Sequence, residues 1–340
     1  MESTPITKDD YFKFDCEAHL WPDTRDIAYL PGFSWQNLVG EAVGRISGVT
    51  KGSEKRKFLE LSYPVSTDAN DSETLIKWMD KYGVDMACAL PTSGWGKTHS
   101  KTALSNSYVM EACEKYPDRL VFIANVGPIT VRGLEYAIWD LEYLVKEKNC
   151  KLLKMYHPED TYINDKQLWP FYRKVSDLGI PVCIHLGWSW APPNLSKYCL
   201  TELLEEVATD FPDLKIIAYH AGWPNFRTLN MIAATHPNVY IGLNALLPWC
   251  ITAPRRIAEI IGEAIQFASS ERVLYGTDYA GRREAKIKYA VEGFLNFQIP
   301  EDMQEGYGFT PISDEDRRNI FGLNLAKLLG IEPKRRAPGK

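Results

Sequence analysis

The chain has 340 residues, of which 45% are hydrophobic and 24% charged, and its formal net charge is −5. This composition is that of a soluble globular protein, and the acidic balance gives no electrostatic support for a nucleic-acid or anionic-membrane partner. No stretch approaches the length of a membrane span, and the N-terminus lacks a signal-peptide pattern. Seven scattered cysteines without a CxxC pair predict reduced thiols and a cytoplasmic location.

Eight short apolar runs have the length of buried strands. They are nearly continuous in apolar residues, as parallel strands are when both faces of their sheet are covered. The predicted strands are residues 12–17, 84–90, 120–126, 151–156, 181–186, 215–219, 238–244 and 272–277.

Helical patterns lie between these strands. Ser72 is predicted to cap a helix that runs to Tyr82, and further helices are predicted over 133–148 and 169–178. The last helix begins with SDED, a capping-box pattern, and is predicted over 313–330.

Eight strand–helix alternations predict a single-domain (β/α)₈ TIM barrel over residues 12–330. The first strand is not followed by a glycine-rich phosphate loop, which argues against a doubly wound dinucleotide-binding sheet. The long segment 20–70 is predicted to be an insertion after strand one, either a cap over the barrel mouth or a dimer contact. Residues 331–340 are predicted to be a loose tail.

Polar residues follow the predicted strands at their carboxyl ends, where such barrels carry their chemistry. Glu17 and His19 are two positions apart on a strand and therefore face the same side. A lone histidine at a strand end is usually a packing residue, but convergence on one rim predicts a shared site. Glutamate, histidine and aspartate together form a mixed nitrogen and oxygen set suited to one divalent cation, Zn²⁺ or Mn²⁺. The polar strand-end residues are Glu17, His19, Lys154, His157, His185, His220, Asn244 and Asp278.

Seven stretches of the chain, taken in order, resemble the amidohydrolase superfamily. The resemblance is to the branch that contains aminocarboxymuconate semialdehyde decarboxylase and the aromatic-acid (resorcylate-type) decarboxylases, and it covers the chain from Phe14 to Gly330. The matching stretches are DCEAH, PDRLVFIANVGP, GIPVCIHLG, FPDLKIIAYHAGWP, HPNVYIGLN, VLYGTDYAG and NIFGLNLAKLLG.

The resemblance implies a mononuclear metal site. Its ligands would be Glu17, His19 and His185, with Asp278 as the fourth ligand or as a bridge to bound water. His220 and Asp278 are implied as the catalytic residues that act on substrate or water.

Two positions near this site depart from patterns in the superfamily. Trp223 stands three residues after His220, where several of these decarboxylases have a glutamate, so that proton relay is missing. Lys154 lies near the position of the carbamylated lysine of binuclear members. Its alternative roles are to pair with a neighbouring charge or with a substrate carboxylate.

The reaction implied is metal-dependent, non-oxidative decarboxylation of an aromatic or conjugated carboxylic acid. The alternative is a metal-dependent hydrolase or hydratase that acts on a lactone, amide or unsaturated acid, and a third reading is a barrel that binds a metal or ligand without catalysis. The three tryptophans in the predicted substrate-contact set follow strand ends and would either wall a planar substrate or lie in the core. A homodimer is implied by the resemblance alone. The predicted substrate contacts are Trp21, Lys154, His157, Trp188 and Trp223.

Overall fold

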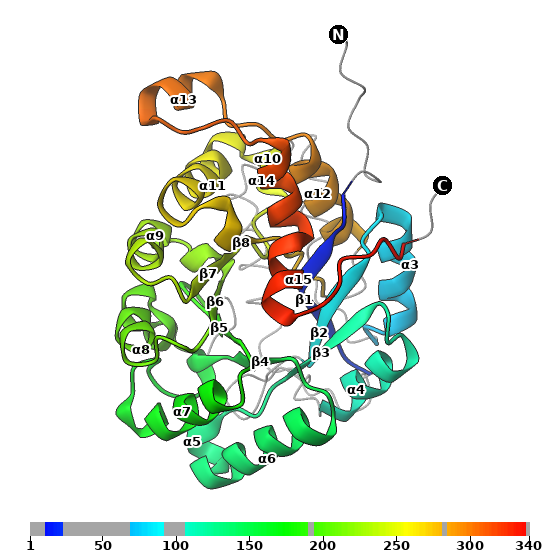
Figure 1. Cartoon of the computed structure of the whole chain (residues 1–340), viewed down its shortest axis with the longest axis vertical. Helices are drawn as coiled ribbons and strands as arrows, with labels where there is room; N and C mark the ends of the chain where they lie inside the picture. The colour runs from blue at the N-terminus through cyan, green and yellow to red at the C-terminus, as the bar shows by residue number, and fades with distance from the viewer. Residues whose placement is uncertain (1–10, 23–68, 92–105, 190–193, 281–283, 338–340) are drawn as a thin grey trace, which may run out of the picture.

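The computed structural model describes residues 11–22, 69–91, 106–189, 194–280 and 284–337. Eight parallel strands form one sheet in the order in which they occur in the chain, with helices around them (Figure 1). The predicted (β/α)₈ barrel is therefore confirmed. The strands are β1 Phe14–Leu20, β2 Met86–Pro91, β3 Leu120–Ala124, β4 Leu152–Met155, β5 Val182–His185, β6 Ile216–Tyr219, β7 Val239–Gly242 and β8 Val273–Leu274.

The barrel closes between β1 and the residues that follow β8. Cys16 N donates to Tyr275 O at 3.1 Å, and His19 N donates to Tyr279 O at 2.8 Å. Ala18 and Tyr279 form a parallel bridge at the same place. This seam matters because residues of the predicted site lie on both of its sides.

The helices cover the outside of the barrel (Figure 1). None of the helices within the described ranges combines the length and the apolar composition that a membrane crossing requires. The helices are α3 Ser72–Tyr82, α4 Asn106–Lys115, α5 Ile129–Arg132, α6 Leu134–Glu147, α7 Trp169–Asp177, α8 Leu204–Asp210, α9 Phe226–Thr235, α10 Trp249–Thr252, α11 Pro254–Ala268, α12 Glu284–Leu295, α13 Glu301–Tyr307, α14 Asp314–Arg318 and α15 Asn324–Leu329. Shorter helical turns are η1 His157–Glu159, η2 Lys166–Leu168, η3 Ser196–Cys199, η4 Thr201–Leu203, η5 His220–Gly222, η6 Ser270–Arg272 and η7 Asn319–Leu323.

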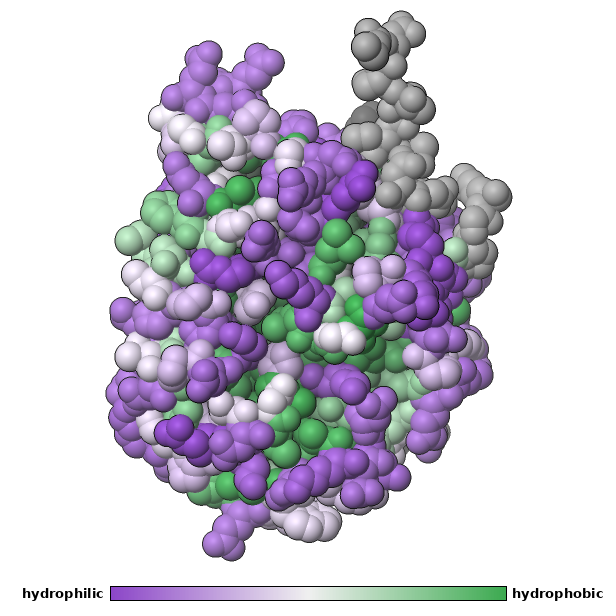
Figure 2. All heavy atoms as spheres, viewed as in Figure 1, coloured by the Kyte–Doolittle hydropathy of each residue, from purple (hydrophilic) through white to green (hydrophobic). Residues whose placement is uncertain are grey.

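The core has two parts, because alternate strand residues point to opposite sides of the sheet. On β2, Met86 and Cys88 join a cluster inside the barrel, whereas Ala87 and Ala89 join the larger cluster between the sheet and the helices. The inner cluster also contains Leu325 of α15, which crosses one end of the barrel (Figure 1). Figure 2 shows apolar side chains gathered in the middle of that face and hydrophilic ones around them.

Strand β1 contains a bulge that redirects its side chains. The register with β2 shifts between Asp15 and Ala18. Cys16 belongs to the inner cluster, whereas Ala18 and Leu20 belong to the outer one. The irregularity therefore allows Cys16 and Glu17, although adjacent, to face the barrel interior together.

Two of the helix predictions need correction. Helix α3 is capped by Asp71, whose side chain accepts from Thr74 N at 2.7 Å, so Ser72 is its first residue and not its cap. The capping box at Ser313 is confirmed, but the last helix is interrupted by a π-helical turn over Asn319–Leu323.

The described part of the C-terminal tail is docked, contrary to the prediction that it is loose. Asp85 is fully buried, and its Oδ1 accepts from Arg336 N at 2.7 Å, Ala337 N at 3.1 Å and Arg335 Nε at 2.9 Å. A buried carboxylate requires such donors, and the tail supplies them. The predicted 20–70 insertion lies mostly outside the described residues, which resume at 69.

The π-helical turn brings Gly322 against the start of β1, and this contact is testable. A Cβ at Gly322 would lie 2.7 Å from Phe12 Cδ1 and 3.0 Å from Phe14 N, with backbone atoms unable to move aside cheaply. We expect Gly322→Ala to lower the free energy of unfolding by about 2 kcal/mol, the scale of an overpacked contact. Urea unfolding is the measurement.

Gly306→Ala is the matched control. Gly306 lies in α13, and an added Cβ meets nothing within 4 Å. The same substitution there should leave the free energy of unfolding unchanged or raise it by up to about 1 kcal/mol. Equal effects at the two glycines would contradict the packing argument.

Candidate metal centre and active site

The predicted site residues stand at the carboxyl ends of the strands. Glu17 and His19 belong to β1, Lys154 to β4 and His185 to β5. Three more lie in the segments that directly follow β6, β7 and β8, namely His220, Asn244 and Asp278, and His157 begins the turn η1 after β4.

Three of the predicted metal ligands converge on one point. His19 Nε2 lies 3.5 Å from Glu17 Oε1 and 3.4 Å from Asp278 Oδ1. One ligand atom from each of the three residues lies within 4.8 Å of the other two. One imidazole nitrogen and two carboxylate oxygens are donors that fit a divalent cation such as Zn²⁺ or Mn²⁺. These three residues would hold the metal.

Glu17 is held by two donors inside the barrel. Its side chain is 1% exposed, and it accepts from Lys154 Nζ at 2.7 Å and from Asn244 Nδ2 at 2.9 Å. Burial raises the pKa of Glu17, but the Lys154 charge and the hydrogen bond with His19 together outweigh it, and the pKa is lowered to about 2. The carboxylate is therefore ionised, and Lys154 takes the role of an ion-pair partner.

Asp278 has a cationic partner that the sequence did not single out. Lys286 of α12 places its Nζ 2.5 Å from Asp278 Oδ2, which leaves Oδ1 turned toward His19. Burial raises the pKa of Asp278, but Lys286 and His19 together outweigh it, and the pKa is held well below its usual range. The only sequence signal was a lysine in the helix after strand eight, and the neighbouring Lys288 fits that description equally.

The two acids also act on His19. Burial lowers the pKa of His19, but its hydrogen bonds with Asp278 and Glu17 outweigh that effect, and the pKa is raised above its usual value. The protein thus holds the imidazole between two carboxylates.

His185 and His220 form a pair beside this cluster. His220 Nε2 lies 2.9 Å from His185 Nδ1, and His185 Nε2 lies 3.1 Å from Trp188 O. Burial lowers the pKa of both rings, and the proximity of His220 lowers that of His185 further. To act as a fourth metal ligand, His185 must give up one of these contacts, so its role as a ligand stays a prediction.

The number of ring protons limits which contacts this histidine pair can serve as a hydrogen-bond donor. Two neutral imidazoles carry two N–H groups. Three contacts involve the ring nitrogens. His185 Nε2 faces Trp188 O, His220 Nε2 faces His185 Nδ1, and His220 Nδ1 lies 3.4 Å from Asn244 O. The contact between the rings uses one N–H group and one lone pair, so the other N–H group serves only one of the two carbonyl oxygens.

Asp15 supports the β1 end of the site from behind. It is buried, and its Oδ1 accepts from Glu17 N at 3.0 Å and from Thr277 N at 2.9 Å. Because Thr277 immediately precedes Asp278, these bonds tie the two sides of the seam together. The sequence analysis did not assign Asp15 a role.

The three tryptophans of the predicted substrate-contact set are placed differently. Trp21 is 2% exposed and lies in the core, where its backbone pairs with that of Asn70. Trp188 is 49% exposed, and Trp223 is partly buried, with its ring centroid 5.7 Å from that of Trp249 and the two planes nearly perpendicular. Trp21 is therefore a packing residue, and the other two remain candidates for contact with a ligand.

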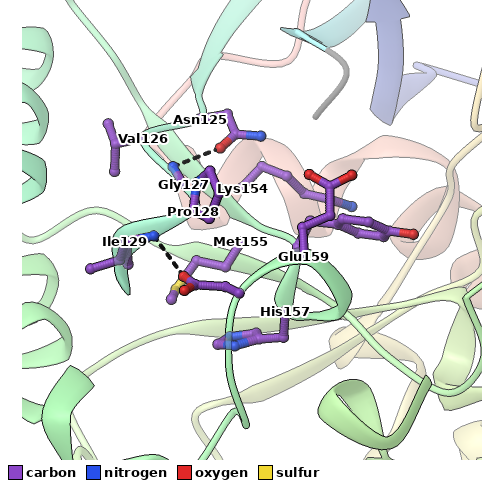
Figure 3. A pocket seen from close by; sticks show the side chains of 11 residues that line it. Asn125, Val126, Gly127, Pro128, Ile129, Lys154, Met155, His157 and Glu159 are labelled. Carbon is purple, nitrogen blue, oxygen red and sulfur yellow. Dashed lines mark hydrogen bonds between the residues drawn. The ribbon is translucent and has the colours of Figure 1, made fainter. Parts of the chain in front are cut away.

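His157 is directed away from the cluster. Its side chain is buried, with Nδ1 3.1 Å from Thr161 O and Nε2 3.2 Å from the Tyr172 hydroxyl. Figure 3 shows its ring pointing away from Lys154 and Glu159, which line the same pocket. Because both ring nitrogens have partners within the fold, the predicted substrate contact is not supported.

A pocket opens beside Lys154 at the ends of β3 and β4 (Figure 3). Its walls include Asn125, Tyr156 and Glu159. Glu159 is 3% exposed and accepts from Asn194 Nδ2 at 3.0 Å. The pocket therefore presents polar groups next to an ammonium group of the cluster.

Comparison with known proteins identifies the family of the chain. The model of a family described as amidohydrolase matches residues 14–331. Among curated proteins, Protein fluG of Emericella nidulans is 27% identical over 105 residues, a match that covers 31% of this chain and only 12% of that protein.

Two solved structures have the same fold. One is the 5-carboxyvanillate decarboxylase of Novosphingobium aromaticivorans, with bound manganese, at 16% identity and a TM-score of 0.60, covering 95% of this chain and 98% of that chain. The other is a probable 2-pyrone-4,6-dicarboxylic acid hydrolase of Acinetobacter baumannii, at 14% identity and a TM-score of 0.57, covering 94% of this chain and 99% of that chain.

The convergence of donors on His19 predicts that this residue binds the metal. We expect His19→Asn to weaken the binding of Mn²⁺ and Zn²⁺ by at least ~100-fold, beyond the 10–100-fold cost of losing a residue that only orients a ligand. Competition with a chromophoric chelator measures the affinity. His236→Asn makes the same change at a partly buried position directly after α9, outside the cluster, and should leave metal affinity unaltered. Similar affinities for the two variants would remove His19 from the metal site.

Proposed function

Because the chain belongs to the amidohydrolase family, we propose that it is a metal-dependent, non-oxidative decarboxylase of an aromatic or conjugated carboxylic acid. The family and its solved relatives support an enzyme of this superfamily, whose members are metal-dependent. The observation that carries the choice of substrate and reaction is the charge arrangement around Glu17. The cation would be Mn²⁺ or Zn²⁺, and the decarboxylase of similar fold contains manganese.

The charges of the site favour an acidic substrate. Two carboxylates, Glu17 and Asp278, are matched by two ammonium groups, Lys154 and Lys286. A divalent cation held there would leave two positive charges in surplus, and a buried surplus of that sign is offset by an anion. A carboxylate with a neighbouring hydroxyl or carbonyl oxygen is such a ligand.

Glu17 also favours decarboxylation over hydrolysis. When bound, the cation supplies an electrophilic centre for the substrate's carboxylate and its neighbouring oxygen. A carboxylate ligand donates more charge than a neutral imidazole and weakens that electrophilicity. The ionised Glu17 therefore suits holding an acid in place better than making a nucleophile from water.

Asp278 is the group placed to move the proton. Its lowered pKa keeps it ionised, so it can accept the proton of a substrate hydroxyl beside the carboxylate. It then returns this proton to the ring carbon that bears the carboxylate. The bond to CO₂ breaks, and its electron pair restores the conjugation. Lys286 orients Asp278 throughout.

His220 would act on the substrate or on water through its lone pair. The ring pairs with His185 through Nε2, and its lowered pKa keeps it neutral near pH 7. A neutral imidazole can accept a hydrogen bond from a substrate hydroxyl and hold it toward Asp278.

The second candidate is a hydrolase or hydratase that acts on a lactone, amide or unsaturated acid. The observation in its favour is that an ionised Asp278 can equally accept a proton from water. The hydrolase of similar fold supports the same reading.

The proposed role of His220 separates catalysis from metal binding. We expect His220→Asn to lower turnover by ~10²-fold or more, the scale for removing a group that handles a proton, while metal content stays near that of the wild type. Metal analysis and steady-state kinetics on the same preparation are the measurements. If metal is lost in step with activity, His220 is a ligand.

Decarboxylation and hydrolysis predict different products in D₂O. We expect a panel of hydroxylated aromatic and conjugated dienoic acids to include substrates that release CO₂ stoichiometrically and carry deuterium at the vacated carbon, because Asp278 exchanges its proton with solvent. Mass spectrometry and NMR follow both. Turnover of lactones or amides by the same metal-loaded preparation, with no CO₂ from any acid, would establish the hydrolase instead.

A further inference from the structure

Helix α6 carries three exposed aromatic rings on the face that points away from the barrel. The exposed fractions of Tyr136, Trp139 and Tyr143 are 50%, 60% and 42%. Their spacing of three and four residues puts them along one side of the helix. These three residues are called the aromatic ridge below.

The rings of the aromatic ridge are already ordered against one another. Tyr136 stacks on Trp139 with ring centroids 5.7 Å apart, and Trp139 stacks on Tyr143 at 6.1 Å with the planes only 11° apart. Arg132 lies over Tyr136 and Lys148 over Tyr143 at the two ends. Docking against such a surface costs little side-chain entropy, since the rings are held in place.

The same helix is apolar on its other side as well. Ala137, Leu141 and Leu144 are buried against the barrel. A surface helix normally has one apolar stripe and a polar outer face. The aromatic ridge is therefore not needed for packing within the chain, and it resembles the centre of a protein interface, where Tyr and Trp are enriched.

We propose that the aromatic ridge of α6 is the contact between two copies of this chain, with the two α6 helices antiparallel across a twofold axis near Trp139. The charges beside the ridge favour a second copy over another partner. Glu135 and Lys146 are both exposed and lie eleven residues apart, close to three full helical turns, on the same side of α6. Lys146 also pairs with Glu142, one turn earlier on the same helix, at an exposed site where such a pair exchanges at little cost. In the antiparallel arrangement the Glu135 of each copy faces the Lys146 of the other.

The area of the ridge agrees with the centre of a dimer interface. Three aromatic side chains of ~150–250 Å² each, about half exposed, offer roughly 300 Å² per copy. A standard interface buries about 800 Å² per partner and consists of an apolar centre surrounded by a polar rim. The charged side chains beside the ridge supply that rim. This inference does not depend on the reaction that the enzyme catalyses.

The test is the mass of the full-length protein in solution. We expect wild type to sediment as a dimer at micromolar concentration, and Trp139→Glu to raise the dimer dissociation constant by at least ~30-fold, the effect of losing a central aromatic anchor. Met231→Glu is the matched control, since Met231 is 56% exposed on α9, away from the ridge, and this variant should remain dimeric.

A charge exchange tests the antiparallel geometry itself. Glu135→Lys and Lys146→Glu should each weaken the dimer, because each places like charges opposite one another, and the double variant should restore it. Circular dichroism confirms that every variant is folded. A monomeric wild type, or a Trp139→Glu variant that dimerises as wild type does, would overturn the proposal. Single variants whose weakening is not reversed in the double variant would overturn the antiparallel arrangement.

Discussion

The ion pair between Glu17 and Lys154 is the interaction on which the site depends. A carboxylate that is 1% exposed would lose its charge in an apolar interior, and here the ammonium group at 2.7 Å keeps it ionised. Lys154 is itself buried above the ring of Tyr219, with its Nζ 3.9 Å from the ring centroid. Neither charge is tolerable alone, so each residue makes the other possible, and Asn244 fixes the remaining oxygen.

The bulge in β1 places Glu17 where this ion pair can form. Without it, a strand that directs Cys16 inward would direct Glu17 outward, toward the helices. The register shift after Asp15 turns Glu17 into the interior and leaves His19 on the same side, and Asp15 holds the redirected backbone through Glu17 N. A local irregularity of the sheet thus serves chemistry at the barrel end, as bulges beside active sites commonly do.

The sequence predicted the parts of the fold and site that depend on local pattern. The eight strands and the convergence of Glu17, His19 and Asp278 followed from apolar runs and strand ends. The rest depended on tertiary contacts. Nothing local distinguishes Lys286 from Lys288 as the partner of Asp278, and nothing in the tail indicates that a buried Asp85 needs its backbone donors. The position of His157 likewise follows from partners that are distant from the strand end.

The seam of the barrel connects stability with function. His19 approaches the seam from β1, and Asp278 approaches it from the segment after β8, where its φ of 52° turns the side chain back toward β1. The backbone bond from His19 N to Tyr279 O already closes the sheet at this level. A cation held by groups on both sides would join the first and last strands a second time, and its binding free energy would add to the stability of the closed barrel. Lys154 and Lys286 balance the charges of the two acids that face each other across this seam.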